Sequence, residues 1–120
     1  MVGNGAANTL KGTPGRDVIV GFGGNDTIRS LGANDLVCSG AGNDVVYTGA
    51  GNDKAYGGAG RDRLFGQGGA DDLAGQGGAD KLNGGPGKDD LLGGPGADLL
   101  VGGLGVDKLL GGPGNDTPKQ

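Results

Sequence analysis

Aspartate recurs at every ninth residue along most of the chain, and this spacing could build a row of cation sites. All 14 acidic residues are Asp and none is Glu. A short carboxylate held close to the backbone of a turn is a suitable oxygen ligand for a hard cation. The phase runs without a slip through Asp17, Asp26, Asp35, Asp44, Asp53, Asp62, Asp71, Asp80, Asp89, Asp98, Asp107 and Asp116.

The residues that follow each aspartate predict a very short strand. In a nonapeptide frame with Asp in the sixth place, residues 57–65 (GGAGRDRLF) are a clean copy of the repeat. The seventh and ninth places vary between charged and apolar, whereas the eighth stays apolar, which is the period-two pattern of a strand. The eighth place holds Ile19, Ile28, Val37, Val46, Ala55, Leu64, Leu73, Leu82, Leu91, Leu100 and Leu109.

The other six places of the repeat predict a turn. The fourth place is glycine from Gly15 to Gly114, with Ala33 as the one exception, so we expect positive φ there. The third place accepts proline four times. Proline has no amide hydrogen, and we expect its carbonyl to stay free to face a ligand.

Strands of three residues cannot stand alone, but they can stack when the chain winds as a coil. Two nonapeptides then make one turn, with one strand in each of two facing sheets, and residues 18 apart stack. Stacked strands lie roughly 4.8 Å apart, so the carboxylates of one column repel unless a positive charge lies between them. One column holds Asp17, Asp35, Asp53, Asp71, Asp89 and Asp107; the other holds Asp26, Asp44, Asp62, Asp80, Asp98 and Asp116.

These residues resemble the repeats-in-toxin (RTX) pattern G-G-x-G-x-D-x-U-x, in which U is a large aliphatic residue. The resemblance covers residues 12–117, and residues 3–11 (GNGAANTLK) are a degraded copy with Asn8 in the aspartate phase. We therefore expect a degenerate N-terminal repeat or cap at 1–11, the repeat domain at 12–117 and a tail at 118–120.

The resemblance implies an all-β fold, a right-handed parallel β-roll with 18 residues per turn that binds Ca²⁺ between neighbouring loops of one column. Five adjacent pairs in each column suggest about ten ions. The small core and the high glycine content lead us to expect folding only with calcium. The implied ligands are the twelve aspartates and main-chain carbonyls of the turns, at Gly40, Gly42, Gly49, Gly51, Gly58, Gly60, Gly85, Gly87, Gly94, Gly96, Gly103 and Gly105.

Several loops depart from this pattern. Residues 30–35 (SLGAND) lack the leading glycines and carry Ala33, so the pattern supports the sites that use Asp35 least. Phe22, Gln67 and Gln76 occupy the second place but keep their carbonyls. Pro118 takes the aliphatic place, and we expect the strand pattern to end there.

Composition excludes several classes of function. The net charge of −4, without a basic stripe interleaved with aromatics, argues against nucleic acid. No apolar run reaches membrane-spanning length, and residues 1–12 show no signal peptide. The chain has no histidine, and its regular carboxylates belong to the repeat, so we do not expect an enzyme. Similar domains occur in secreted bacterial toxins, proteases, lipases, epimerases and surface-layer proteins, which implies leaderless type I secretion to the outside of the cell.

Two outward surfaces leave other roles open. A calcium-stabilised solenoid could use an outward face for adhesion or ice binding, although the row Thr9, Thr27, Val45, Arg63, Lys81, Leu99 and Thr117 is mixed. The outward charges are interpreted as solvated: Asp72, Asp90, Lys54, Arg63, Lys81 and Lys108. An apolar stripe in the ninth place predicts a homo-oligomer or a partner domain, with the lone Cys38 able to crosslink two copies. The stripe comprises Val20, Cys38, Tyr56, Ala74, Leu92 and Leu110.

Overall fold

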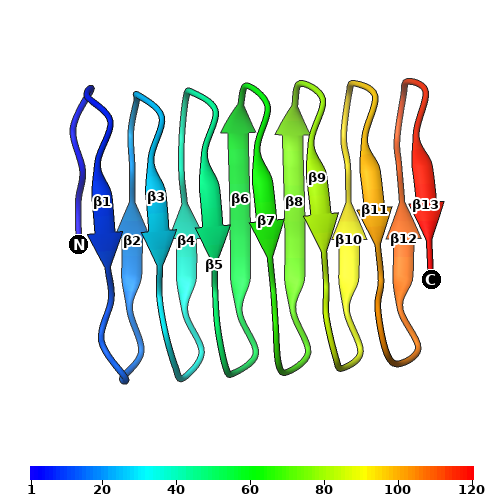
Figure 1. Cartoon of the computed structure of the whole chain (residues 1–120), viewed down its shortest axis with the longest axis horizontal. Helices are drawn as coiled ribbons and strands as arrows, with labels where there is room; N and C mark the ends of the chain where they lie inside the picture. The colour runs from blue at the N-terminus through cyan, green and yellow to red at the C-terminus, as the bar shows by residue number, and fades with distance from the viewer.

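The computed structural model describes residues 1–120 and winds them into a solenoid of two parallel sheets (Figure 1). The seven-stranded sheet holds β1 (Thr9–Lys11), β3 (Thr27–Arg29), β5 (Val45–Tyr47), β7 (Arg63–Phe65), β9 (Lys81–Asn83), β11 (Leu99–Val101) and β13 (Thr117–Lys119). The six-stranded sheet holds β2 (Val18–Val20), β4 (Leu36–Cys38), β6 (Lys54–Ala59), β8 (Asp72–Gly77), β10 (Asp90–Leu92) and β12 (Lys108–Leu110). This confirms the two-sheet parallel architecture.

Each strand pairs in parallel with the strand two places further along the chain. Val46 lies opposite Leu64, and Leu64 lies opposite Leu82, so the register advances by 18 residues per coil. Successive coils follow the longest axis of the molecule, with the turns at the two edges (Figure 1). The molecule measures 32 × 26 × 13 Å and contains no helix long and apolar enough to cross a membrane.

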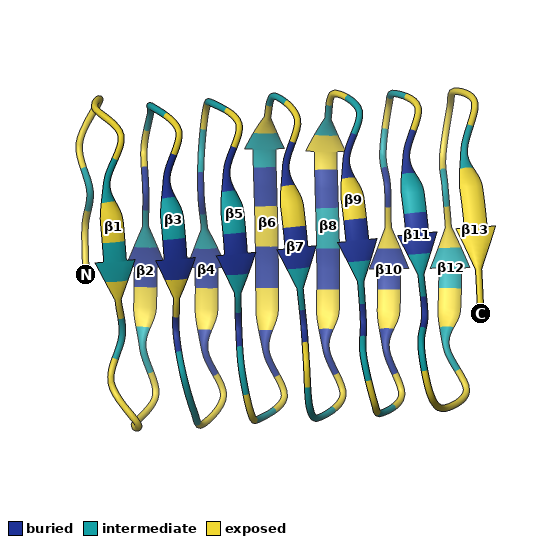
Figure 2. Ribbon diagram, in the orientation of Figure 1, coloured by how far each residue is buried: buried dark blue, intermediate teal, exposed yellow.

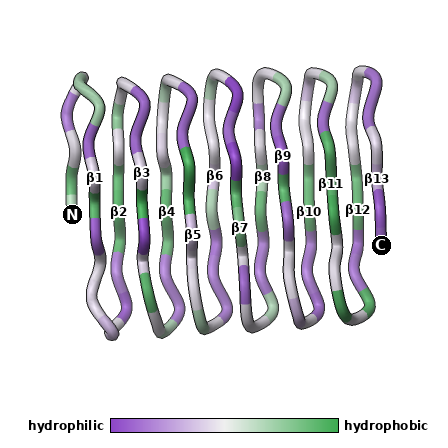
Figure 3. The backbone as a smooth tube through the Cα atoms, viewed as in Figure 1, coloured by the Kyte–Doolittle hydropathy of each residue, from purple (hydrophilic) through white to green (hydrophobic).

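The core is a single layer of aliphatic side chains between the two sheets. Burial is greatest in the strands and the segments beside them, and the turns at both edges are largely exposed (Figure 2). The strand centres also hold much of the apolar character of the chain (Figure 3). Leu10 and Leu109 pack against this core at its two ends. Its ten buried members confirm the eighth-place prediction: Ile19, Ile28, Val37, Val46, Ala55, Leu64, Leu73, Leu82, Leu91 and Leu100.

Truncating one core side chain should destabilise the whole coil. Leu64 has 0% exposure and lies between Val46 and Leu82 in its sheet. We expect Leu64→Ala to lower the free energy of unfolding in calcium by about 2–5 kcal/mol, because it leaves a cavity in a layer with no other side chains to fill it. Thermal or urea unfolding measures this loss. Leu92→Ala, on an outward position that is 47% exposed, is the control and should cost about 1 kcal/mol or less.

The two ends of the chain continue the coil. β1 pairs with β3 in the common register, and Leu10 occupies the aliphatic place of the degraded first repeat. The expectation that the strand pattern ends at Pro118 is wrong, because β13 includes Pro118 opposite Leu100. β13 is an edge strand: the Thr117 N–H donates to the Asp98 carbonyl and the Lys119 carbonyl accepts from the Gly102 N–H, on either side of β11. Proline is tolerated in such a strand because its missing amide hydrogen need not serve the ladder.

Candidate metal sites

The turns share one backbone conformation in which the second and fourth places take positive φ. The fourth-place prediction is confirmed from Gly24 to Gly114, and Ala33 also adopts it, with φ of 70°. Gly15, in the first full repeat, is the exception. The second place was not predicted to need positive φ, because Phe22, Leu31, Gln67 and Gln76 stand there and hide the glycine signal. All four of these residues take positive φ all the same.

The fourth-place glycines also permit close stacking of successive turns. A methyl group on Gly69, where φ is 117°, would collide with the carbonyl oxygen of Gly51 in the neighbouring coil. The adjacent Gly68 has no atom within 4 Å of the corresponding position. Glycine is therefore required at residue 69 by both conformation and space.

This contrast gives a matched pair of variants. We expect Gly69→Ala to destabilise the calcium-loaded protein by at least about 2 kcal/mol, because backbone strain and the collision with Gly51 add together. Gly68→Ala should change the free energy of unfolding by no more than about 0.5 kcal/mol. Unfolding curves of the two variants in the same calcium buffer measure the difference, and equal stabilities would contradict the stacking of turns seen here.

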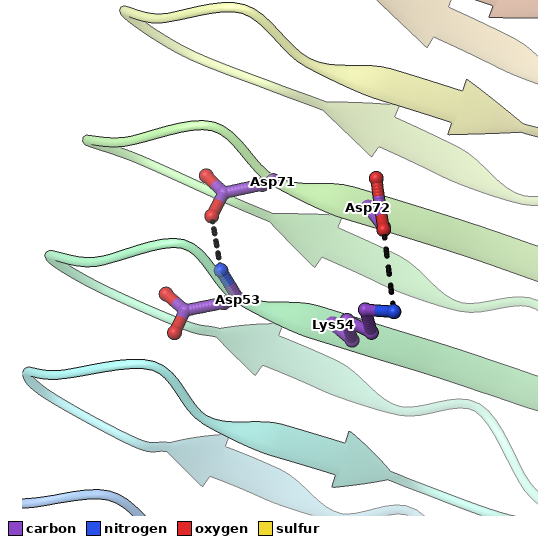
Figure 4. Close-up of polar contacts among 4 residues, drawn as sticks. All are labelled: Asp53, Lys54, Asp71 and Asp72. Carbon is purple, nitrogen blue, oxygen red and sulfur yellow. Dashed lines mark hydrogen bonds and ion pairs between the residues drawn. The ribbon is translucent and has the colours of Figure 1, made fainter.

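The aspartates lie in two columns, one at each edge of the solenoid. In both columns, one carboxylate oxygen accepts a hydrogen bond from the main-chain amide of the aspartate 18 residues earlier. The Asp53 N–H donates to Oδ1 of Asp71 at 2.9 Å (Figure 4), and the Asp35 N–H donates to Oδ1 of Asp53 at 2.8 Å. The same bond continues to the C-terminal coil, where the Asp98 N–H donates to Oδ1 of Asp116. The stacked carboxylates are thus fixed in place by the backbone.

The second carboxylate oxygen of most of these aspartates is buried and has no hydrogen-bond partner. Nine of the aspartates, from Asp26 to Asp98, are at most 3% exposed. Burying a carboxylate oxygen without a partner is costly, so the arrangement calls for a cation. The ten unpartnered oxygens are Oδ2 of Asp26, Asp35, Asp44, Asp53, Asp62, Asp71, Asp80, Asp89, Asp98 and Asp107.

The first-place glycines leave room beside these oxygens. A methyl group on Gly66 would lie 2.5 Å from Oδ2 of Asp71, and one on Gly57 would lie 2.6 Å from Oδ2 of Asp62. Any larger residue at this place has to adjust around the carboxylate. In the loops that carry it, the first-place glycine therefore keeps the space next to the unpartnered oxygen free of a side chain.

Burial makes the charged form of these carboxylates unfavourable. It raises the pKa of Asp62 and Asp71 to about 7 and the pKa of Asp80 to about 6. The bond from the neighbouring backbone amide lowers each pKa, and charged neighbours in the column raise it. The pKa values of Asp44, Asp53, Asp89 and Asp98 are raised in the same direction, with burial as the largest cause.

Three loops carry a hydroxyl residue in the first place, and the sequence patterns did not predict how these loops accommodate it. Ser30, Ser39 and Thr48 are fully buried. Their hydroxyls donate to the carbonyls of Thr48, Gly57 and Gly66, each 18 residues further on. Asp35 lies in the loop that departs most from the pattern, yet it is buried like the other aspartates, with 3% exposure and an unpartnered Oδ2.

The third-place amide bonds a main-chain carbonyl of the preceding coil in several loops. In the N-terminal loops it donates to the second-place carbonyl of the preceding coil, as Ala41 does to Phe22 at 2.7 Å and Ala50 does to Leu31 at 2.8 Å. Pro86 cannot donate to the corresponding Gln67 carbonyl.

The expectation that proline leaves its own carbonyl free is wrong for two of the four prolines. The Pro95 carbonyl accepts from the Gly78 N–H at 3.2 Å, and the Pro113 carbonyl accepts from the Gly96 N–H at 3.0 Å. Because proline has no amide hydrogen, the second-place carbonyl of the preceding coil receives no hydrogen bond from it. The prolines therefore change the bonding of the C-terminal loops in a way that the residue types alone did not indicate.

Side chains alone do not complete a metal site in this solenoid. No group of three or more His, Cys, Asp or Glu side chains gathers at one point. A cation held at the turns would combine carboxylate oxygens from stacked aspartates with main-chain carbonyl oxygens. An all-oxygen donor set of this kind suits calcium, which accepts six to eight ligands in flexible geometry.

Comparison with known families identifies the repeat. A family model for the RTX calcium-binding nonapeptide repeat (four copies) matches residues 2–37, 39–73, 47–82, 65–100 and 83–118. The chain belongs to this RTX repeat family. Its RTX repeats in a two-sheet solenoid fit a calcium-binding β-roll, a structural module, with Ca²⁺ as its ligand. No individual curated protein shows significant similarity to the chain.

Proposed function

We propose that this RTX β-roll folds when calcium binds between its stacked loops and serves as a folding or stabilising module of a secreted or cell-surface bacterial protein. The observation that carries the proposal is the set of ten buried, unpartnered Oδ2 atoms along the two aspartate columns. Leaderless type I secretion fits this role, because RTX repeats are typical of secreted bacterial proteins. A chain unfolded at low cytosolic calcium would wind only after export.

The proposed ligands of each ion come from two stacked loops of one column. Asp53 and Asp71 exemplify the carboxylates, and Gly49 and Gly51 exemplify the second- and fourth-place carbonyls. The Gly49 carbonyl also accepts from the Gly68 N–H at 3.1 Å, so a metal would use its other lone pair. Residues 1–11 would cap the first coil, residues 12–117 would bind the ions and residues 118–120 would form the tail. About ten ions are proposed, one for each adjacent pair within a column.

Calorimetric titration of CaCl₂ into chelator-treated protein tests this function. We expect saturable heat with a stoichiometry of about ten ions per chain, accompanied by a gain of strand signal in far-UV circular dichroism. MgCl₂ is the control and should give little heat, because Mg²⁺ demands octahedral geometry and keeps its waters. No heat with Ca²⁺, or equal heats with the two metals, would overturn the proposal.

The apolar stripe of the six-stranded sheet is proposed as a contact surface for a second copy or a partner domain. Its residues form one row by register, from Val20 beside Cys38 to Leu92 beside Leu110. Leu92 is 47% exposed, and Leu110 is 51% exposed. Sedimentation with calcium and reductant should show self-association that Leu92→Ser weakens, and Cys38 should crosslink two copies when the reductant is omitted. A monomer at every concentration would refute self-association.

Ice binding gains no support from the seven-stranded sheet. The row Thr9, Thr27, Val45, Arg63, Lys81, Leu99 and Thr117 is continuous by register, but its side chains are mixed in size and charge. Ice recognition would need a regular row of one small polar side chain. Freezing hysteresis measured on the calcium-loaded protein should therefore be absent.

A further inference from the structure

The outer faces of the two sheets differ in charge. The seven-stranded sheet carries no acidic residue in any strand, whereas the six-stranded sheet carries Lys54, Lys108, Asp72 and Asp90. We call the outward side chains of the seven-stranded sheet the basic face. Every charged side chain in these strands is thus positive, although the chain as a whole has a net charge of −4. The cations of the basic face are Lys11, Arg29, Arg63, Lys81 and Lys119.

An aromatic ladder runs along the ninth-place row of the basic face. The rings of Tyr47 and Phe65 stack with centroids 5.0 Å apart and planes 10° apart. The Arg29 guanidinium lies 4.9 Å from the Tyr47 centroid, which is a cation–π contact. Asn83 follows Phe65 in the register of the sheet. Tyr47 therefore contacts Arg29 and Phe65, whereas the neighbours of Phe65 in this row are Tyr47 and Asn83.

Two hollows flank Phe65 and have different chemistry. One, of about 420 Å³, is lined by Tyr47, Phe65, Gln67, Asn83 and Pro86 together with two glycines. It offers an aromatic wall and two side-chain amides. The other, of about 210 Å³, brings Arg63 and Lys81 beside Phe65 and Asn83. Phe65 and Asn83 line both hollows, so one ligand could contact the amides and the cations together.

We propose that the basic face binds an acidic saccharide, that is, a sugar ring that bears a carboxylate. The apolar C–H face of a sugar ring packs against an aromatic wall, and its hydroxyls exchange hydrogen bonds with the Gln67 and Asn83 amides. Arg63 and Lys81 lie on neighbouring strands in one row and supply charge-assisted bonds to the carboxylate. The side chains proposed to recognise the saccharide belong to neither aspartate column, although the larger hollow shares Gly85 with the proposed calcium loops. Saccharide binding is therefore a second role, beyond calcium binding.

The structure favours a saccharide over the other anionic partners. Single-stranded nucleic acid binds by stacking successive bases on open aromatic faces, but the Tyr47 ring already contacts Arg29 and Phe65. Binding to an anionic membrane would require apolar side chains that protrude into the lipid. Phe65 and Tyr47 are instead half-buried. The larger hollow, of about 420 Å³, also lies within the usual range for small-ligand sites.

Binding of tri-galacturonate to the calcium-loaded protein tests the proposal. Its affinity is measured by calorimetry at a fixed free calcium concentration, because carboxylated sugars also bind calcium. We expect the double variant Arg63→Ala/Lys81→Ala to weaken binding by about tenfold or more, as the loss of two charge-assisted bonds would. The matched control Lys54→Ala/Lys108→Ala removes the same charge from the six-stranded face and should change affinity by less than about twofold.

A second variant separates a site from general attraction. Phe65→Ala keeps every charge and should also weaken tri-galacturonate binding by about tenfold or more. The strand signal in calcium, recorded for each variant, shows that the fold is retained and reports separately on the calcium function. Equal binding by both double variants, no binding by the parent protein, or tighter binding of a single-stranded DNA oligonucleotide that depends on Arg63 and Lys81 would each overturn the proposal.

Discussion

Calcium-free protein at pH 8 is expected to lose most of its strand structure, and acidification without calcium is expected to restore part of it. At pH 8 the stacked carboxylates are charged and buried, and Oδ2 of Asp62 and Oδ2 of Asp71 have no partner. Such groups oppose the wound state unless a cation or a proton neutralises them. In the proposed function calcium supplies the neutralising charge, and protons should replace it in part at lower pH.

The direction of this pH effect follows from the raised pKa values. Asp62 and Asp71 have a folded pKa of about 7, against an ordinary value of 3.8. The folded state therefore binds more protons than the unfolded chain between these values. The stabilisation from these groups is complete below about pH 3.8 and is lost as the pH rises through about 7. Calcium-free protein should accordingly gain stability as the pH falls from 8 towards 4.

Calcium-loaded protein should show the opposite trend. The metal requires the deprotonated carboxylate, so protons compete with it as the pH falls through the same window. Far-UV circular dichroism at pH 8 and pH 5 measures both trends, on protein freed of calcium by chelation and gel filtration and on the same protein with CaCl₂ restored. MgCl₂ at equal concentration controls for general screening. A complete strand signal at pH 8 without calcium would show that the wound state does not need the metal.

The nine-residue pattern predicted the fold because it fixes the position of every side chain that matters to the core. An apolar eighth place from Ile19 to Leu109 leaves only one inward residue per strand, so the period specifies both the two sheets and the 18-residue register. Strict glycine in the fourth place predicted positive φ for a similar reason. A backbone conformation that recurs in every repeat selects the same residue type each time, so the sequence alone reveals it.

Bonds between neighbouring coils were not predictable in the same way. The Asp53 N–H donates to Oδ1 of Asp71, and Oδ2 of Asp71 has no partner. This arrangement depends on side-chain rotamers and on the spacing of two coils. The carbonyls of Pro95 and Pro113 were expected to be free, but amides 17 residues earlier in the chain reach them. Pro118 was expected to end the strand pattern, but only an edge position in the assembled sheet shows that its missing amide is harmless.

Replacing Asp71 by asparagine should separate the metal sites from ordinary surface charge. Asp71 is fully buried in the middle of its column, and its Oδ1 accepts from the Asp53 amide at 2.9 Å. Asp71→Asn can keep this acceptor but loses the charge and the second oxygen, which two adjacent proposed sites share. We expect the calcium concentration at the folding midpoint to rise by about tenfold or more, since losing about 1.4 kcal/mol of binding free energy has this effect.

The neighbouring residue provides the control. Asp72 points outward, with its side chain 54% exposed, and lies 3.8 Å from the Lys54 ammonium (Figure 4). Asp72→Asn removes the same charge one residue away, and the lost ion pair is exposed, so the calcium midpoint should move by less than about twofold. Calcium titrations followed by circular dichroism compare the two variants directly. Equal shifts would mean that net charge, and not the nine-residue phase, controls the response to calcium.

The same pair of variants also tests the calcium-free state, where the expected order is reversed. Without metal, Asp71→Asn removes a buried charge whose pKa is raised to about 7, so this variant should retain more strand signal than the parent at pH 8. Asp72→Asn should behave like the parent, because its carboxylate is hydrated in both states. A substitution that weakens the calcium-loaded form and strengthens the metal-free form is specific to a buried ligand, since simple loss of packing would weaken both.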